Sequence, residues 1–189
     1  TLTGSGAING TGNGLDNILT GNNAANRLTG GAGNDTYVIG AGDSIVESVN
    51  AGIDWVQSSI THTLAANVEN LTLTGTAIIN GTGNGLNNIL IGNSAVNTLT
   101  GGAGNDTYIV GTGDTVVEAL NAGTDTVQSA GTWSLGANVE NLVLVGSAAV
   151  NGTGNTLANV LTGNAGNNAL VGGDGNETMA GRQGNDGLR

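Results

Sequence analysis

Two nine-residue stretches decide the fold: Gly30–Val38 reads GGAGNDTYV, and Gly101–Ile109 reads GGAGNDTYI. Each belongs to a run of four nine-residue blocks, and a third run begins at Gly154. Most blocks begin with glycine, and all carry an apolar residue at the eighth position, which is a sign of a repeat architecture. The eighth positions are Leu19, Leu28, Tyr37, Val46, Leu90, Leu99, Tyr108, Val117, Leu161, Leu170, Met179 and Leu188.

Each block supplies a six-residue turn, in which glycine tolerates positive φ, and a three-residue strand with one apolar side chain pointing inward. A single block cannot bury that side chain, whereas stacked blocks form a continuous core. Two blocks make one coil, so alternate blocks are expected on the same edge. We therefore predict an all-β solenoid of some ten coils, a rod about 50 Å long.

A longer repeat encloses the short one. Residues 4–74 and 75–145 are about two-thirds identical, and 146–189 form a partial third copy. We call this unit the long repeat. Its segments 48–82 and 119–153 lose the nine-residue spacing but keep strand-like alternation, which predicts further coils with different turns. We expect residues 1–189 to form one elongated domain that belongs to a longer array.

The composition excludes several classes of protein. Among 189 residues there are 36 glycines and neither proline nor cysteine, which argues against helix bundles, collagen and disulfide scaffolds. The formal net charge is −11. Nucleic acid is therefore an unexpected partner, a multivalent cation is an expected one, and no apolar stretch is long enough to insert into a membrane.

Both nine-residue stretches match the pattern G-G-x-G-x-D-x-U-x at every defined position. In this the chain resembles the RTX, or haemolysin-type, calcium-binding nonapeptide-repeat proteins. The resemblance implies a right-handed parallel β-roll, or β-helix solenoid, with Ca²⁺ between neighbouring turns on one edge. Carbonyls and the sixth-position acid would be the ligands. The implied acidic ligands are Asp35, Asp106, Asp186 and Glu177, and the implied turn glycines are Gly30, Gly31, Gly33, Gly101, Gly102 and Gly104.

The sixth positions one coil upstream depart from this pattern, because they are Asn17, Asn88 and Asn168. Sites with a single carboxylate would bind calcium weakly, or the asparagines would stack as neutral amide ladders. Asp54 and Asp125 lie two blocks and one further position beyond the acids of the two perfect blocks. They complete a site on the same edge if the next turn shifts by one residue; otherwise they are solvated turn residues. Other acids that recur in the second copy of the long repeat are Asp43, Glu47 and Glu69, which become Asp114, Glu118 and Glu140.

No catalytic constellation is present in the sequence. The one histidine, His62, shares an alternating face with Ile60 and Leu64, which favours a packing role, and lysine is absent. We expect a non-catalytic calcium-binding structural or display segment of a large secreted or cell-surface bacterial protein, of the adhesin or surface-layer type. The alternative is an RTX module attached to an extracellular hydrolase or lyase; an ice-binding face is a weaker one, because Thr-x-Thr pairs such as Thr72 and Thr74 do not recur in every coil.

The resemblance also implies type I secretion. The chain would stay unfolded at low cytosolic calcium and fold outside the cell. Neighbouring copies and surface glycans are further expected partners.

Overall fold

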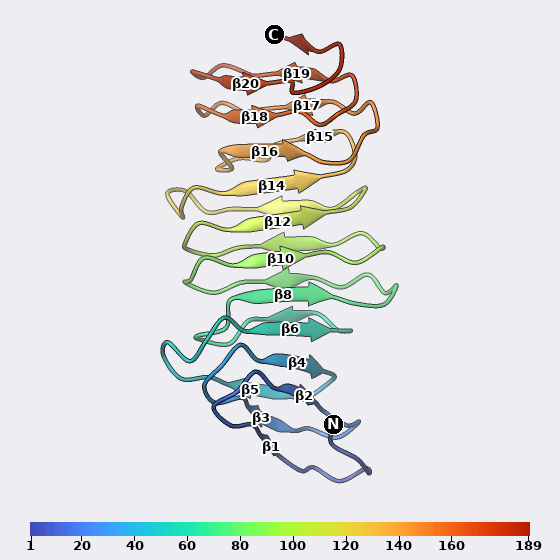
Figure 1. The fold of residues 1–189 in the computed structure, drawn as a ribbon, viewed down its shortest axis with the longest axis vertical. Coiled ribbons are helices and arrows are strands. Elements are labelled where there is room, and N and C mark those ends of the chain that lie inside the picture. The colour runs from blue at the N-terminus through green and yellow to red at the C-terminus, as the bar shows by residue number, and fades with distance from the viewer.

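The computed structural model describes residues 1–189 as a stack of coils built from 21 β-strands without any helix (Figure 1). All paired strands run parallel, and the stack is a β-solenoid of about ten turns. Since the chain forms no helix, none is available to cross a membrane. The predicted all-β solenoid is confirmed.

One face of the solenoid is a single ten-stranded sheet, which we call the front sheet. Its strands lie one above another from one end of Figure 1 to the other. They are β2 (Ile18–Thr20), β4 (Thr36–Ile39), β6 (Trp55–Ser58), β8 (Asn70–Leu73), β10 (Ile89–Ile91), β12 (Thr107–Val110), β14 (Thr126–Ser129), β16 (Asn141–Leu144), β18 (Val160–Thr162) and β20 (Thr178–Ala180).

The opposite face, the back, is divided into three smaller sheets. The first contains β1 (Gly10–Thr11), β3 (Arg27–Thr29) and β5 (Ser44–Val46). The second contains β7 (His62–Thr63), β9 (Gly81–Thr82), β11 (Thr98–Thr100) and β13 (Thr115–Val117). The third contains β15 (Trp133–Ser134), β17 (Gly152–Thr153), β19 (Ala169–Val171) and β21 (Gly187–Leu188). The back is therefore interrupted after β5 and again after β13, one long repeat later.

The coils differ in length. Hydrogen bonds join equivalent turns 18 residues apart from Asn17 to Asp35, 19 apart from Asp35 to Asp54, 15 apart from Asp54 to Glu69, and 19 apart from Glu69 to Asn88. These four coils make up one long repeat. The prediction of further coils in 48–82 and 119–153 is confirmed, because β6 to β9 and β14 to β17 lie there. The 18-residue coil of two nine-residue blocks holds from Asn17 to Asp35, whereas the other three coils have 19, 15 and 19 residues.

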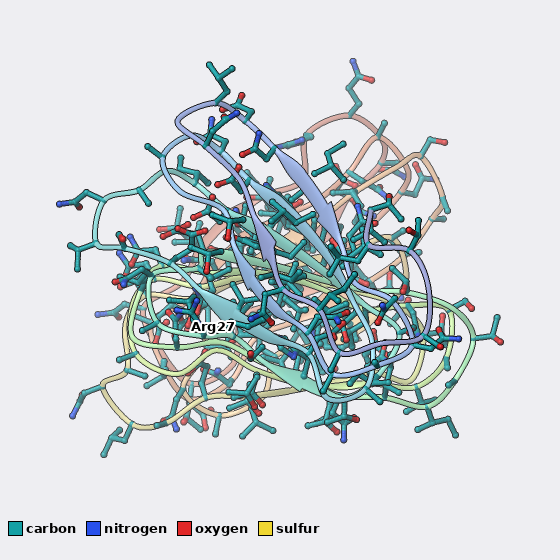
Figure 2. All side chains as sticks on the ribbon, turned by 90° about the horizontal axis from the view of Figure 1, so that it is seen from below. Arg27 is labelled. Atoms are coloured by element: carbon teal, nitrogen blue, oxygen red, sulfur yellow. The ribbon has the colours of Figure 1, made fainter.

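The core is a column of apolar side chains between the two faces, and side chains fill the interior in the view along the axis (Figure 2). Most predicted inward positions are buried, but Val46 and Val117 are 38% and 44% exposed. Their neighbours Ile45 and Val116 point inward instead, because β3 pairs Leu28 with Ile45 and not with Val46. The fourth block of the first two runs is thus shifted by one residue, and a one-residue shift reverses which side chain faces the core. At the C-terminal end, Met179 is only partly buried and Leu188 is 48% exposed.

The two edges of the solenoid differ sharply in charge. We call the edge whose turns lead into the front sheet the acidic edge; it lies on the left of Figure 1. It holds Asp16, Asp35, Glu47, Asp54, Glu69, Asp106, Glu118, Asp125, Glu140, Asp174 and Glu177. The opposite edge holds only Asp43, Asp114 and Asp186.

Candidate metal centre

Three carboxylates meet inside the acidic edge. Asp35 ends the turn before β4, Asp54 ends the turn before β6, and Glu47 follows β5 directly. One oxygen from each lies within 4.8 Å of the others. The next repeat builds the same cluster from Asp106, Glu118 and Asp125. The acids come together because successive turns on this edge stack directly above one another.

The two aspartates of the first cluster each use only one carboxylate oxygen. Asp35 Oδ1 accepts a 2.7 Å hydrogen bond from the backbone amide of Asn17, and Asp54 Oδ1 accepts a 2.8 Å bond from the amide of Asp35. The second oxygen, Oδ2, is buried on both residues and has no hydrogen-bond partner. The same is true of Asp106 and Asp125. Each cluster therefore presents two buried oxygens that lack a positive or donor group.

The glutamate of the cluster is held by its surroundings. Glu47 Oε1 accepts a 3.0 Å hydrogen bond from the backbone amide of Gly30 and another from the Tyr37 hydroxyl. Its Oε2 accepts a 3.3 Å bond from Ser48. Tyr108 donates to Glu118 in the second cluster. The Gly30 amide thus donates to a side chain directly after the last residue pair between β3 and β5.

A glycine faces the centre of each cluster. A Cβ atom at Gly30 would collide with Asp35 Oδ2, the Tyr37 hydroxyl and Glu47 Oε1, and one at Gly101 would meet the equivalent three atoms. The space beside Gly30 is thus bounded by oxygen atoms. Gly31 and Gly33 in the same turn have φ values of +111° and +106°, which L-residues rarely adopt. The GGxG segment is needed for both the cradle and the turn.

Burial raises the pKa of every acid in the two clusters. Desolvation is the main cause and repulsion between the carboxylates adds to it, so the pKa of Asp54 and of Asp106 rises to about 6 and that of Glu118 to about 7. Desolvation is also the main cause that raises the pKa values of Asp35, Glu47 and Asp125. A cation between these groups would relieve both the desolvation and the repulsion.

The donor set fits calcium. Ca²⁺ takes six to eight oxygen ligands and prefers carboxylates together with backbone carbonyls. Asp35, Glu47 and Asp54 supply carboxylate oxygens only, without a nitrogen or sulfur donor. Buried oxygens without partners and a cradle bounded by oxygens are what a hard cation requires. These three residues, and their equivalents one repeat later, would hold the ion.

The other two predicted acidic ligands, Glu177 and Asp186, lie on different edges of the solenoid. Glu177 occupies the place of Asp35 in the third repeat; its Oε2 accepts a 2.8 Å bond from Asn159, and its Oε1 is buried without a partner. The residue equivalent to Glu118 in the third copy is Arg189, so no third carboxylate cluster forms there. Asp186 lies on the opposite edge, where its Oδ1 accepts a 2.9 Å bond from Asn168.

The remaining acids of the opposite edge are fully hydrogen-bonded. Asp43 accepts bonds from the amides of Asn26 and Gly40, both at 2.9 Å. Asp114 accepts equivalent bonds from Asn97 and Gly111 at 2.8 and 2.7 Å. Neither belongs to a carboxylate cluster. These two acids brace turns.

The asparagines one coil upstream behave as amide braces. Asn17 and Asn88 accept a hydrogen bond from the amide four residues earlier, at 2.8 and 2.7 Å. The Nδ2 of Asn88 also donates to the carbonyl of Glu69 at 2.9 Å. The coil interfaces below Asp35 and Asp106 therefore combine one carboxylate with a hydrogen-bonded amide.

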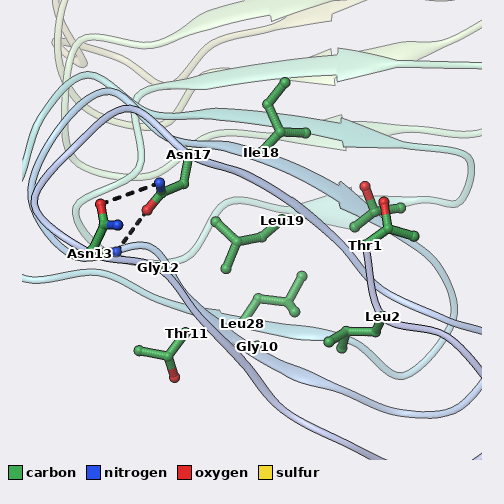
Figure 3. A pocket seen from close by; sticks show the side chains of 11 residues that line it. Thr1, Leu2, Gly10, Thr11, Gly12, Asn13, Asn17, Ile18, Leu19 and Leu28 are labelled. Atoms are coloured by element: carbon green, nitrogen blue, oxygen red, sulfur yellow. Dashed lines mark hydrogen bonds between the residues drawn. The ribbon is translucent and has the colours of Figure 1, made fainter.

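Groups outside the acidic edge offer little chemistry. His62 is half-buried in β7; burial lowers its pKa, and its Nε2 has no partner. Arg27, labelled in Figure 2, is exposed on β3, and its guanidinium donates only to the hydroxyl of Thr29, at 3.3 Å. A pocket at the N-terminal end, beside Leu2, Leu19 and Leu28, is lined by no acid and no histidine (Figure 3).

Sequence reasoning grouped Asp35 with Asp54 but missed the third member of the site. Glu47 sits at the ninth position of its block, where most other blocks carry Thr, Val or Ile, and the nine-residue spacing ends directly after it. An acid at the end of a strand, just where a repeat changes its spacing, was the available signal.

The fold and these sites together define a parallel β-solenoid with buried, all-oxygen cation sites between its coils. The family model described as RTX calcium-binding nonapeptide repeat (4 copies) matches residues 11–46, 82–117 and 153–188, more than half of the chain. The chain therefore belongs to the RTX calcium-binding repeat family. Neither the search of curated proteins nor the search of solved structures gave a match. The family match ends one residue before Glu47 and one before Glu118, so each cluster joins an RTX turn to a turn outside the repeat.

Proposed function

We propose that this chain is a non-catalytic, calcium-stabilised structural segment of a large secreted or cell-surface bacterial protein, of the adhesin or surface-layer type. The observation that carries the proposal is the buried three-carboxylate cluster at Asp35, Glu47 and Asp54, which returns in the second copy of the long repeat. A repeated site inside the fold suits a role in holding the rod together. An elongated rod suits the display of other parts of a protein away from a cell.

Calcium would couple binding to folding. Eleven acids share one narrow edge, so their mutual repulsion opposes folding until cations neutralise it. An ion that binds the folded chain and not the unfolded chain adds stability in proportion to the logarithm of its concentration. The chain would then remain unfolded at low cytosolic calcium, pass through a type I exporter, and fold outside the cell. Neighbouring copies and surface glycans are the partners that such a segment would meet.

The two clusters should be the tightest sites, because affinity rises with the number of carboxylates. Each contains three, whereas the interface between Asn17 and Asp35 contains one. Calcium titration by calorimetry should therefore resolve two tight sites above a background of weak ones. Circular dichroism should show that β structure grows as these sites fill.

A single substitution tests this assignment. Asp35→Asn keeps an oxygen that can accept the Asn17 amide but removes a cluster charge, so one of the two tight sites should disappear. Asp16→Asn is the matched control on the same edge. Asp16 Oδ1 accepts a 2.7 Å bond from the amide of Asn34, and the next repeat makes that bond with Asn87. The control should keep both sites.

Terbium gives a second readout, since it replaces calcium at oxygen sites and its emission is sensitised by a nearby phenol. Tyr37 and Tyr108 each donate a hydrogen bond to the glutamate of a cluster. Excitation of tyrosine should produce terbium emission that calcium abolishes, and Asp35→Asn should lower it by about half. Unchanged stoichiometry in Asp35→Asn would mean that the ions lie elsewhere. Full order of the parent chain without calcium would remove calcium from its structural role.

A further inference from the structure

The outer face of the front sheet carries no charge. The first and third residues of each strand form two rows whose register the strand pairs define, and all of them are at least partly exposed except Asn70, which is buried. The first row is Ile18, Thr36, Trp55, Asn70, Ile89, Thr107, Thr126, Asn141, Val160 and Thr178. The second row is Thr20, Val38, Gln57, Thr72, Ile91, Ile109, Gln128, Val143, Thr162 and Ala180.

Apolar side chains are also exposed on this face. Ile18, Ile109 and Val160 are 72%, 38% and 45% exposed, and Ile89 and Ile91 are partly exposed beside them. The back carries Arg27 in its outer row, and all 14 acids lie in the turns at the two edges. A neutral, β-branched surface of constant strand spacing is left open between two charged edges.

We propose that this face binds the same face of a second copy of the chain, with the two rods parallel. A second copy is the occupant that matches a face repeating at the spacing of its own strands. Two sheets pack face to face about 10 Å apart when neutral side chains interdigitate. The amide groups of Gln57 and Gln128 and the threonine hydroxyls can bond across such an interface without bringing a charge into it.

The distribution of acids selects the parallel arrangement. A two-fold axis along the rods places the acidic edge of one copy over the acid-poor opposite edge of its partner. A two-fold axis across the rods, which makes them antiparallel, places two acidic edges side by side. Each acidic edge holds eleven acids against three on the other edge, so the antiparallel pair suffers the greater repulsion.

The contact area sets the strength that we expect. Ten strands about 4.8 Å apart give a face about 45 Å long. Two rows of side chains make it about 10 Å wide, so each copy contributes about 450 Å², roughly half of a standard interface. The dimer is therefore weak for this chain and gains area with every added long repeat. It should be sought in calcium at protein concentrations up to about 1 mM.

Sedimentation equilibrium tests the face. The paired residues Ile91 and Ile109 lie at the middle of the outer surface. Changing both to lysine should raise the dimer Kd at least about tenfold, because like charges then meet across the axis. The control changes Thr98 and Thr115, a paired set on the back, to lysine, which adds the same charge on the other face. It should leave the Kd unchanged, and circular dichroism should show both variants folded.

Cross-linking tests the parallel arrangement. Because the chain has no native cysteine, only the introduced thiols react. Val38→Cys and Thr162→Cys place one thiol near each end of the face. In the parallel dimer each variant cross-links to itself through a short bis-maleimide reagent, and a mixture of the two gives no mixed product. Mixed products without self-linked ones would overturn the parallel arrangement. A parent chain that stays monomeric up to about 1 mM, or a control that weakens the dimer equally, would overturn the interface itself.

Discussion

The backbone amide of Asp35 donates a 2.8 Å hydrogen bond to Oδ1 of Asp54, 19 residues further along the chain. This bond ties two coils together and fixes the carboxylate of Asp54 beside that of Asp35. The same carboxylate leaves its Oδ2 buried and free for an ion. One side chain thus serves the fold with one oxygen and the metal site with the other.

The two roles of Asp54 can be separated by comparing two substitutions. Asp54→Asn keeps an acceptor for the Asp35 amide, whereas Asp54→Ala leaves that buried amide unpaired. Both remove the charge. Without calcium, the free energy of unfolding should be lower for the alanine variant than for the asparagine variant by about 1–3 kcal/mol. Both should lose calcium affinity. Equal stability of the two variants in metal-free urea titrations would refute the bracing role.

The response to pH should change sign when calcium is added. Folded Asp54 and Asp106 have a pKa of about 6 and folded Glu118 one of about 7, all above the unfolded values of 3.8 and 4.5. Such groups add stability that is fully present below pH 4 and is lost as pH rises through 6 and 7. The metal-free Tm should therefore fall from pH 5 to pH 8.

Calcium competes with those protons for the same oxygens. Its affinity should rise from pH 5 to pH 8, with proton release on binding near pH 6. Calorimetry in two buffers of different ionisation enthalpy measures that release, and thermal unfolding at each pH gives the Tm with and without the ion. A metal-free Tm that rises between pH 5 and pH 8 would contradict the prediction that burial and mutual repulsion raise the pKa of the cluster carboxylates.

The cradle beside Gly30 offers a steric test. Gly30→Ala places a methyl group against Asp35 Oδ2, the Tyr37 hydroxyl and Glu47 Oε1, so the first tight site should be lost while the second remains. Gly14→Ala is the control, because nothing lies within 4 Å of a Cβ there and its φ is not positive. Calcium stoichiometry should drop by one in the first variant and stay at the parent value in the second. Retention of both sites in Gly30→Ala would place the ion outside the cradle.

The sequence indicated the fold through spacing that does not depend on three-dimensional detail. A glycine turn followed by one apolar residue, repeated every nine positions, leaves few alternatives to stacked coils. The same spacing placed Asn17 and Asp35 on one edge, and their hydrogen bond across adjacent coils confirms this. The pairing of Asp35 with Asp54 followed from a one-residue shift that the sequence allowed but did not require.

What could not be predicted depends on how the coils change length. The pairing of Leu28 with Ile45 turns Val46 outward and brings Glu47 to the end of the back sheet. That register arises from packing between coils, and nothing in the local pattern of IGAGDSIVE distinguishes Ile45 from Val46 as the inward residue. Glu47 looked like one more turn acid for this reason, although it completes the site.

The asparagine turns allow a final comparison between two equivalent positions. Asn88 donates from Nδ2 to the carbonyl of Glu69 at 2.9 Å, whereas Asn17 donates only to Asn13 Oδ1 at 3.4 Å. Asn88→Asp replaces a donor with a carboxylate that faces a buried carbonyl. It should cost about 1–3 kcal/mol of metal-free stability, and Asn17→Asp should cost less.

Calcium should reverse this order. In Asn88→Asp, the new carboxylate lies between the Glu69 carbonyl of the preceding coil and Asp106 of the following coil, so an ion beside it gains a carboxylate ligand and its affinity rises. The difference in Tm between calcium-saturated and metal-free protein should therefore grow more for Asn88→Asp than for Asn17→Asp. Thermal unfolding of both variants measures it directly. If the metal-free stabilities of the two variants are equal, the amide of Asn88 does not brace the turn, and its hydrogen bond to the Glu69 carbonyl does not contribute to the stability of the fold.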